Sequence, residues 1–501
     1  MMRSLATLAT GSLLASVASS QVVKWDIQRR GQRQPRLTKR ADGSVEEVIT
    51  NLKNQGGYFA SCQVGTPGQN LTLQLDTGSS DVWVPSNTAS ICSESSSSFG
   101  SSSSDSCTLG TFNSDDSSSF EVVGQDLFAI SYVDGSHSKG DYISETFEIG
   151  GAKITNLTMG LGMDTTIPYG LVGVGYAINE AIVASTGSAS DSYVNLPEKM
   201  RNEGLIKTNA YSLWLNDLDA STGNILFGGI DTDKYHGDLT RINIYKDSQT
   251  QAFSSFIVAM TSLEASSSSG TDTLSSEYPV EAVLDSGTTF SYLPQDLAEQ
   301  VWDEVGASYN SEVQVAVLPC NLENNAGYFT FGFAGVDGPQ INITMDELVL
   351  PLTTGDPIQF QSGPYKGQDA CQFGIQNFSS SPYLLGDTFL RSAYVVYDLE
   401  NNEIGIAPTD FNSTTSNVVA FASQGAQIPS SAAAPSQDAI SQVSSTTSPT
   451  YGASGGFQDS SGSNGGSSGA SMPSPFDWSS VFVLGTSMLF TMIGGGVFFL
   501  V

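Results

Sequence analysis

Two short, nearly identical phrases carry the residues of this chain that are best suited to chemistry. They are Leu75-Asp76-Thr77-Gly78-Ser79-Ser80 and Leu284-Asp285-Ser286-Gly287-Thr288-Thr289. When two carboxyl groups share one site, repulsion raises one of the two pKa values, so one group can act as general acid and the other as general base. A single Asp-Ser/Thr-Gly triplet arises easily by chance. The doubled and extended phrase instead predicts a two-part protein that brings Asp76 and Asp285 together to activate a water molecule.

A second repeat lies downstream of each aspartate. Leu171-Val172-Gly173 follows the first phrase and Leu384-Leu385-Gly386 follows the second at a similar distance. An apolar pair followed by Gly suits a buried strand that another backbone passes closely, because a side chain would block the approach. An ordinary core strand would have the same pattern. Together with the first repeat, however, it indicates that each half of the chain follows one plan.

Short β-rich runs dominate the elements that must position these residues. Examples are Leu71-Thr72-Leu73-Gln74-Leu75 and Tyr394-Val395-Val396-Tyr397, each bounded by turn-forming residues. Helical stretches are few, and the clearest is Pro294 to Gly306, where Leu297, Val301 and Val305 are spaced four apart. We expect a mainly β protein of two barrel-like lobes, with a boundary near His236 to Asn243 and a cleft between the lobes.

These motifs resemble those of the pepsin-like aspartic proteases, from about Tyr58 to Pro408. The similar segments are Val64-Gly65-Thr66-Pro67, Asp76 through Pro85, Asp285 through Thr289, and Leu385-Gly386-Asp387-Thr388-Phe389-Leu390-Arg391. The resemblance implies a mainly β, bilobal fold with the active site in the cleft, no cofactor or metal, and protein or peptide substrates.

The resemblance also assigns roles within the two phrases. It implies that Asp76 and Asp285 hold the attacking water, with Gly78 and Gly287 completing the motifs. Further support residues would be Thr77 and Ser286, hydrogen-bonded across the lobe junction, and Ser79 and Thr288, each orienting one carboxylate.

A flap over the cleft is a further family feature, and Ile130-Ser131-Tyr132-Val133-Asp134-Gly135-Ser136 matches it. Tyr132 would be the flap tyrosine, with Gly135 in the turn and Trp83 in the same substrate-binding group. Independently of the family, Asp-Gly suits hairpin turns that need positive φ. A plain surface hairpin is the other interpretation.

Asp134 would place a carboxylate over the cleft, where it would attract a Lys or Arg side chain of a bound peptide. Fungal yapsins within the family cleave at basic residues, and the Asp-Ser-Gly-Thr-Thr form of the second phrase is yapsin-like or candidapepsin-like. A solvated turn aspartate is the alternative. We therefore expect cleavage at Lys or Arg.

The chain is strongly acidic, with 51 acidic and 19 basic residues, a formal net charge of −32 and an isoelectric point near 4.1. Such a charge disfavours nucleic acid as a partner and is consistent with a secreted protein that acts at acidic pH.

The N-terminus contains two expected processing segments. Residues 1–20 resemble a secretory signal peptide, with Arg3, an apolar stretch and small residues at the end. Residues 21–40 are basic and end in Lys39-Arg40, a site of the kind that kexin-type proteases cut. We expect a cationic propeptide that binds the anionic enzyme near neutral pH and is released as carboxylates protonate.

Five cysteines leave one unpaired. Cys92 and Cys107 bracket a Ser-rich loop, and Cys320 and Cys371 both lie in the second half, so we expect one bridge in each lobe. The second pairing also matches a bridge typical of the family. Cys62 would then be free and buried in an apolar strand. Proteolysis of the loop at residues 93–106 would leave two disulfide-linked chains, as in some yapsin-like relatives; otherwise we expect a monomer.

Beyond Pro408 the composition shifts to Ser, Thr, Ala, Gly and Pro, too polar to bury a core. Such tracts often form O-glycosylated stalks. Sequons at Asn70, Asn156, Asn342, Asn377 and Asn412 are consistent with the secretory pathway.

The segment from Trp478 to Val501 is uncharged and lies behind a polar spacer. This layout favours a signal for a glycosylphosphatidylinositol (GPI) anchor over a terminal membrane span. We expect the GPI anchor to be attached at Asn464, although Gly469 fits the usual spacer length better. The protein would then lie on the outer face of the plasma membrane or in a cell wall.

The expected division of the chain is a signal peptide at 1–20, a propeptide at 21–40, an N-terminal lobe at 41–237, a C-terminal lobe at 238–410, a stalk at 411–475 and a GPI signal at 476–501.

His137 and His236 form no His-Glu-x-x-His pattern, and no Gly-x-Ser-x-Gly elbow accompanies them, which disfavours zinc and serine proteases. The serious alternative to an endopeptidase is a catalytically weak surface glycoprotein that serves structure or adhesion on a protease fold.

Overall fold

The structure, a computed structural model, describes residues 22–29, 57–92, 107–220, 222–274, 276–353 and 356–437, together with 445–446 and 457. The expected signal peptide, the Lys39-Arg40 processing site and the Ser-rich loop at 93–106 lie outside these residues. So do Asn464 and the C-terminal apolar segment.

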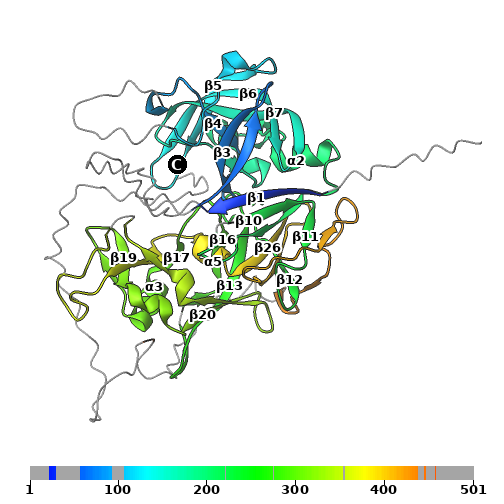
Figure 1. The fold of residues 1–501 in the computed structure, drawn as a ribbon. Helices are drawn as coiled ribbons and strands as arrows, with labels where there is room; N and C mark the ends of the chain where they lie inside the picture. The colour runs from blue at the N-terminus through cyan, green and yellow to red at the C-terminus, as the bar shows by residue number, and fades with distance from the viewer. Residues whose placement is uncertain are drawn as a thin grey trace, which may run out of the picture.

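Two β-rich lobes make up the molecule, as the sequence predicted, and the largest of its sheets runs from one lobe into the junction (Figure 1). This sheet has 14 strands. In spatial order they are β29 (Ser431–Ala433), β12 (Leu239–Asn243), β27 (Glu403–Pro408), β26 (Ala393–Asp398), β9 (Ala210–Trp214), β10 (Gly223–Phe227), β1 (Val23–Arg29), β2 (Tyr58–Val64), β3 (Gln69–Asp76), β8 (Leu171–Gly173), β4 (Val82–Pro85), β7 (Ala152–Thr165), β6 (His137–Ile149) and β5 (Glu121–Ser131).

The second lobe is built on a sheet of eight strands and a smaller one of four. The larger contains β21 (Gln340–Thr344), β20 (Tyr328–Phe333), β13 (Ile257–Ser267), β16 (Val280–Leu284), β25 (Tyr383–Leu385), β17 (Ser291–Pro294) and β24 (Ile375–Phe378), with β14 (Gly270–Thr273) paired to β13. The smaller contains β18 (Ser308–Asn310), β19 (Val315–Pro319), β23 (Ala370–Phe373) and β22 (Val349–Pro351). Two separate pairs join β11 (Gly229–Asp231) to β28 (Val418–Ala420) and β15 (Glu277–Tyr278) to β30 (Ser445–Thr446).

Helices are short in the described part of the chain. They are α1 (Ala181–Thr186), α2 (Leu196–Asn202), α3 (Gln295–Val305), α4 (Met345–Leu348) and α5 (Asp387–Leu390), with single 3₁₀ turns η1 (Ser90–Cys92), η2 (Ser114–Asp116), η3 (Ala177–Asn179), η4 (Ala189–Asp191) and η5 (Cys320–Asn324). The predicted helix at Pro294 to Gly306 is confirmed as α3. Its Leu297, Val301 and Val305 are buried. Gly306 ends it in the left-handed conformation that glycine adopts most readily.

The repeated plan of the two halves is visible in the strand pairing. β3 runs parallel to β8, with Asp76 opposite Gly173, and β16 runs parallel to β25, with Leu284 opposite Leu385. A Cβ atom on Gly173 would lie 2.6 Å from the Ser80 nitrogen, and one on Gly386 would lie 2.3 Å from the Thr288 carbonyl oxygen. The predicted close backbone passage at both glycines is therefore confirmed.

One strand comes from the segment expected to be a propeptide. β1 lies between β10 and β2 and is antiparallel to both; Figure 1 shows it crossing between the two lobes. Val23, Trp25 and Ile27 are buried, and the Trp25 indole donates a hydrogen bond to the Ser61 carbonyl (2.8 Å). Apolar burial and main-chain pairing therefore hold this segment, in addition to the charge attraction expected from its composition.

The expectation that residues beyond 410 bury nothing is wrong for residues 411–437. Phe421 and Ile428 are buried in a cluster with Trp214 and Tyr394. β28 pairs with β11, and β29 adds to the edge of the large sheet beside β12. A polar segment can pack in this way because main-chain pairing along a sheet edge needs few apolar side chains to support it.

The two halves of the sequence interleave at the junction. β9 and β10 come from the half before the expected boundary at residues 237–238, whereas β26, β27 and β12 come after it. All five strands belong to one continuous sheet. The lobes are therefore joined through this sheet and not through a linker alone.

Candidate active site

The two repeated phrases meet at the lobe junction. Asp76 ends β3 and Asp285 directly follows β16, and both side chains have 0% exposure. The next residue of each phrase reaches into the other half. Thr77 donates its main-chain N–H to the Ser286 hydroxyl (3.2 Å) and its hydroxyl to the Leu284 carbonyl (2.9 Å). Ser286 reciprocates through its N–H to the Thr77 hydroxyl (2.9 Å) and its hydroxyl to the Leu75 carbonyl (3.2 Å).

Each carboxylate is held by donors from its own phrase. The Gly78 N–H donates to Asp76 Oδ1 (2.8 Å) and the Ser79 hydroxyl donates to Asp76 Oδ2. In the second half, Gly287 N–H donates to Asp285 Oδ1 (2.8 Å) and the Thr288 hydroxyl donates to Oδ2 (2.7 Å). The same two donor types, a glycine N–H and a hydroxyl, thus fix the two carboxyl groups in equivalent positions.

The two carboxyl groups lie close enough to share a hydrogen bond. Burial raises the pKa of Asp285, and the negative charge of Asp76 raises it further. Burial also raises the pKa of Asp76, but hydrogen bonds from Ser79 and Gly78 oppose the increase. Because Asp76 has the better-stabilised anion, the pair holds one proton that resides mainly on Asp285.

Only glycine fits at position 78. A Cβ atom there would lie 2.6 Å from Asp285 Oδ1 and 2.7 Å from its Cγ. Such a contact is far shorter than ordinary van der Waals separation, so an alanine would push the two carboxyl groups apart.

A hairpin formed by β5 and β6 brings Tyr132 to this site. In its turn, the Tyr132 N–H donates to the Ser136 carbonyl (2.8 Å), and the Gly135 N–H donates to the Tyr132 carbonyl (2.9 Å). Gly135 has φ of 82°, as expected for an Asp-Gly turn. The Tyr132 hydroxyl accepts a hydrogen bond from the Trp83 indole (2.8 Å). Burial raises the pKa of Tyr132, and the negative charge of Asp76 raises it further.

Asp134 lies half-buried at the tip of this hairpin. Its Oδ1 accepts hydrogen bonds from the Ser136 N–H (2.8 Å) and hydroxyl (2.6 Å). After burial, the charge of Asp134 is the next cause of the raised pKa of Tyr169 in the first half and of Tyr292 on β17 in the second. The carboxylate therefore acts on side chains from both halves of the chain.

Known proteins are similar to this chain over most of its length. The family model "Eukaryotic aspartyl protease" matches residues 57–409. This chain belongs to that family. The protein named "Probable aspartic-type endopeptidase opsB" from Aspergillus oryzae is 40% identical over 414 residues, which cover 81% of this chain and 80% of that protein. The protein of that name from Arthroderma benhamiae is 39% identical over 462 residues (88% and 89%), and "Secreted aspartic protease 8" from Candida albicans is 35% identical over 372 (74% and 80%).

Membership of this family makes the protein an aspartic-type endopeptidase, as the two repeated Asp-Thr/Ser-Gly phrases predicted.

Sequence reasoning missed two buried acids near the site, Asp81 and Glu180, which are both 0% exposed. Asp81 lies within the first matched segment, so its position beside the motif was the available signal. Glu180 has no such signal, because only the fold brings it to the site.

Both expected disulfides of this protease form, Cys92–Cys107 and Cys320–Cys371, and Cys62 is free and buried. Burial raises the pKa of the Cys62 thiol to about 12, which keeps it protonated and unreactive.

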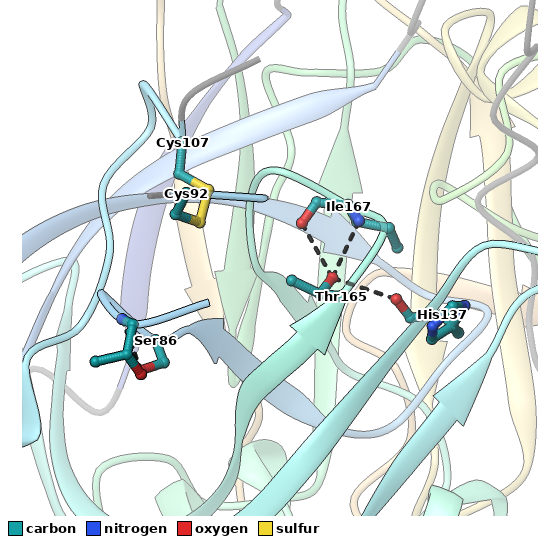
Figure 2. Close-up of a disulfide and its surroundings, with 7 residues drawn as sticks. Ser86, Cys92, Cys107, His137, Thr165 and Ile167 are labelled. Atoms are coloured by element: carbon teal, nitrogen blue, oxygen red, sulfur yellow. Dashed lines mark hydrogen bonds between the residues drawn. A yellow bond between two sulfur atoms is a disulfide. The ribbon is translucent and has the colours of Figure 1, made fainter. Parts of the chain in front are cut away.

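Figure 2 shows the first disulfide, Cys92–Cys107, with its surroundings, which include Thr165, Ile167 and His137. Its η1 turn packs against β7. At the end of β7, the Thr165 hydroxyl accepts a hydrogen bond from the Ile167 N–H (3.0 Å) and lies 3.2 Å from the His137 carbonyl, to which it can donate. His137 is the first residue of β6. The η1 turn of the disulfide thus contacts β7, and β7 in turn pairs with β6 of the flap hairpin.

The sequon asparagines lie at the surface of the protease. Asn70, Asn156, Asn342 and Asn412 are exposed and Asn377 is half-buried. Among the residues that the structure describes, no helix is long and apolar enough to cross a membrane. The same residues contain no group of three or more His, Cys, Asp and Glu side chains able to hold a metal ion.

Proposed function

We propose that this endopeptidase hydrolyses peptide bonds with a water molecule activated between Asp76 and Asp285. The observation that carries the proposal is the buried pair itself, held by equivalent donors and by reciprocal Thr77 and Ser286 hydrogen bonds. A carboxylate beside a carboxylic acid supplies a general base and a general acid in one site.

In the proposed mechanism, ionised Asp76 takes a proton from the water as the water oxygen bonds to the scissile carbonyl carbon. Neutral Asp285 gives its proton to the carbonyl oxygen, which yields a tetrahedral diol. Asp76 then donates its proton to the amide nitrogen, the carbon–nitrogen bond breaks, and a diol hydroxyl returns a proton to Asp285. The pair ends in its starting protonation state, and Tyr132 covers the site from the flap.

The proposed substrates carry Lys or Arg at the cleavage site. Asp134 supports this preference, because its half-buried carboxylate on the flap acts on side chains of both halves. A charge pair at about 4 Å gains about 1–4 kcal/mol near a protein surface. Loss of the charge should therefore weaken cleavage of basic substrates selectively.

The proposed setting is the outer face of the plasma membrane or the cell wall, reached through a signal peptide and held by a GPI anchor at Asn464. A relative named as secreted supports the route, and so do the surface sequons. We further propose zymogen processing at Lys39-Arg40 by a kexin-type protease, and optional nicking between Cys92 and Cys107.

The test is cleavage of a random peptide library at acidic pH by the full-length protein and its Asp285→Asn variant, with and without pepstatin. Cleavage at Lys or Arg that vanishes in the variant supports the proposal. Asp134→Asn should lower kcat/KM for basic peptides about tenfold, equivalent to about 1.4 kcal/mol, and leave apolar peptides unchanged. Cleavage at apolar pairs only would refute the role of Asp134, and a folded parent that stays inactive after cleavage at Lys39-Arg40 would refute the mechanism.

A further inference from the structure

A second pair of buried acids lies next to the active site. Asp81 follows the first phrase and directly precedes β4, and its carboxylate accepts three hydrogen bonds. The donors are the Tyr142 hydroxyl (2.9 Å), the Tyr193 hydroxyl (2.8 Å) and the Ala181 N–H (2.8 Å). These donors compensate for burial of an anion, so Asp81 can remain ionised although burial raises its pKa.

Glu180 lies beside this anion and accepts fewer hydrogen bonds than Asp81 does. Its Oε2 accepts one hydrogen bond, from the Tyr193 N–H (2.8 Å), and its Oε1 is buried with no hydrogen-bond partner in the described structure. The charged groups that face it are Asp81 and Glu198, both acidic. A buried carboxylate with one donor and two acidic neighbours is strongly disfavoured. Glu180 is therefore neutral in this arrangement, and burial raises its pKa to about 10.

The pair connects three parts of the active site. Asp81 lies on the strand connection that carries the Asp76 phrase, and its carbonyl accepts the Gly173 N–H (3.0 Å). Tyr142 belongs to the flap strand β6, whereas Glu180 and Ala181 begin α1, which packs against the flap strand β5. The same two acids thus contact the dyad strand, the flap and the segment at 176–195.

An aromatic cluster continues the contact to the flap tip. Tyr142 packs edge-on against Tyr193 (centroids 5.5 Å apart) and Phe128 (5.4 Å). Phe128 lies 6.2 Å from Trp83, whose indole donates to the Tyr132 hydroxyl. Closely packed side chains transmit displacements to their neighbours, so this cluster couples Tyr142 to the flap tip.

We propose that Asp81 and Glu180 are positioning residues, which hold the flap and α1 against the Asp76 strand only while Glu180 carries a proton. They touch neither substrate nor reacting atoms. Their effect is to keep Tyr132 over the aspartate pair at acidic pH and to release it as the pH rises.

The direction of the pH effect follows from the linkage between protonation of Glu180 and assembly of the site. Glu180 has its proton in the assembled site up to a high pH, whereas a released, solvated Glu180 would titrate near 4.5. Between these two values the released form binds fewer protons, so each pH unit favours release about tenfold. The assembled site is therefore fully favoured below pH about 4.5 and is progressively lost above it. The alkaline limit of activity should fall inside this interval.

The test compares Glu180→Gln, which mimics the protonated side chain and can still accept from Tyr193, with Asp191→Asn, a control that removes an exposed acid of η4 outside the hydrogen-bond network. The pH profile of kcat/KM is measured on the full-length enzyme and both variants. We expect Glu180→Gln to move the alkaline limb upward by about one pH unit or more and the control to leave it in place. An unmoved limb in Glu180→Gln would overturn the proposal.

Hydrogen exchange of the flap amides, residues 128–137, provides a readout that needs no catalysis. In the parent and in Asp191→Asn, protection should fall as the pH rises after correction for the intrinsic exchange rate, while Glu180→Gln keeps its protection. Because the inference rests on the endopeptidase activity, this measurement separates the two failures. An inactive parent with a pH-dependent flap would contradict the proposed mechanism alone, and equal profiles in all three proteins would contradict the positioning role.

Discussion

At the residue scale, the hydrogen-bond frame explains why the doubled phrase has the composition it does. Each phrase has a hydroxyl after the aspartate that reaches the other half, a glycine whose N–H donates to its own carboxylate, and a second hydroxyl that orients this carboxylate. In the first phrase the glycine also admits the opposite carboxyl group. Thr and Ser meet the same geometric need and therefore alternate between the two copies. The exchange costs little, because the hydroxyl donor and acceptor are kept.

The hydrogen bond from Trp83 to Tyr132 leads to the first prediction. Trp83→Phe retains an aromatic ring but removes the Nε1–H donor, so the Tyr132 hydroxyl loses its partner. A neutral hydrogen bond of this kind contributes about 0.5–1.5 kcal/mol. We expect kcat/KM to fall about threefold to tenfold with the fold retained, and Tyr132→Phe to have a similar effect. A double-mutant cycle measures the coupling, and fully additive losses would contradict this pairing.

At the element scale, the strand β1 gives the second prediction. Trp25 is buried and anchored to Ser61, in the middle of the strand that joins β10 to β2. Truncation of a buried Trp to Ala costs about 3–5 kcal/mol. We expect Trp25→Ala to lower the free energy of unfolding of the full-length chain by this amount, measured by urea denaturation. Lys24→Ala, which changes an exposed residue of the same strand, is the control.

Cleavage after Arg40 extends this prediction to the peptide itself. If apolar burial and main-chain pairing hold β1, the cut peptide should co-elute with the protease on size exclusion at both acidic and neutral pH and in 0.5 M salt, because salt at about this concentration screens surface charge. Release by salt alone would show that charge attraction dominates, as the composition first suggested.

Some elements of the fold and site could be predicted from the sequence, and others could not. The Asp-Thr/Ser-Gly phrases, the Gly173 and Gly386 repeats and the α3 periodicity are local patterns with one physical meaning, and each is found in the structure. β1 alternates apolar Val23, Trp25 and Ile27 with polar residues like any strand, but the basic composition of its segment predicts only a charge attraction. Glu180 could not be predicted, because a glutamate just before a helix becomes a buried acid only through tertiary packing.

At the scale of the whole molecule, the segment after residue 410 leads to the third prediction. Lys234 Nζ donates to the Ser413 and Thr415 carbonyls (2.8 Å each), and the Asp231 carboxylate accepts from Ser416 and Asn417. Together with buried Phe421 and Ile428, these contacts hold residues 411–437 on the junction sheet.

Truncation tests this role directly. A chain that ends at residue 410 should be less stable than a chain that ends at residue 437 by at least about 3–5 kcal/mol, the usual cost of losing one buried aromatic side chain. Phe421→Ala in the full-length chain should reproduce most of the loss. Equal midpoints for the chains ending at 410 and 437 would show that the segment only lies on the surface.

Two buried acids in the second half of the chain give the last prediction, a stability maximum at acidic pH. Burial, with Asp272 and Asp303 nearby, raises the pKa of Glu304 from 4.5 to about 7. Burial raises that of Asp398 from 3.8 to about 6, against hydrogen bonds from Asn401 and with Glu403 adding to the increase. Each group stabilises the fold fully below its unfolded value and loses that contribution as the pH rises through its folded value, at up to about 1.4 kcal/mol per pH unit. The melting temperature of the full-length protein should therefore fall steadily from pH about 4 to 7, and Glu304→Gln with Asp398→Asn should flatten that fall. A melting temperature that rises toward neutral pH would mean that these carboxyl groups are ionised and stabilised in the folded protein.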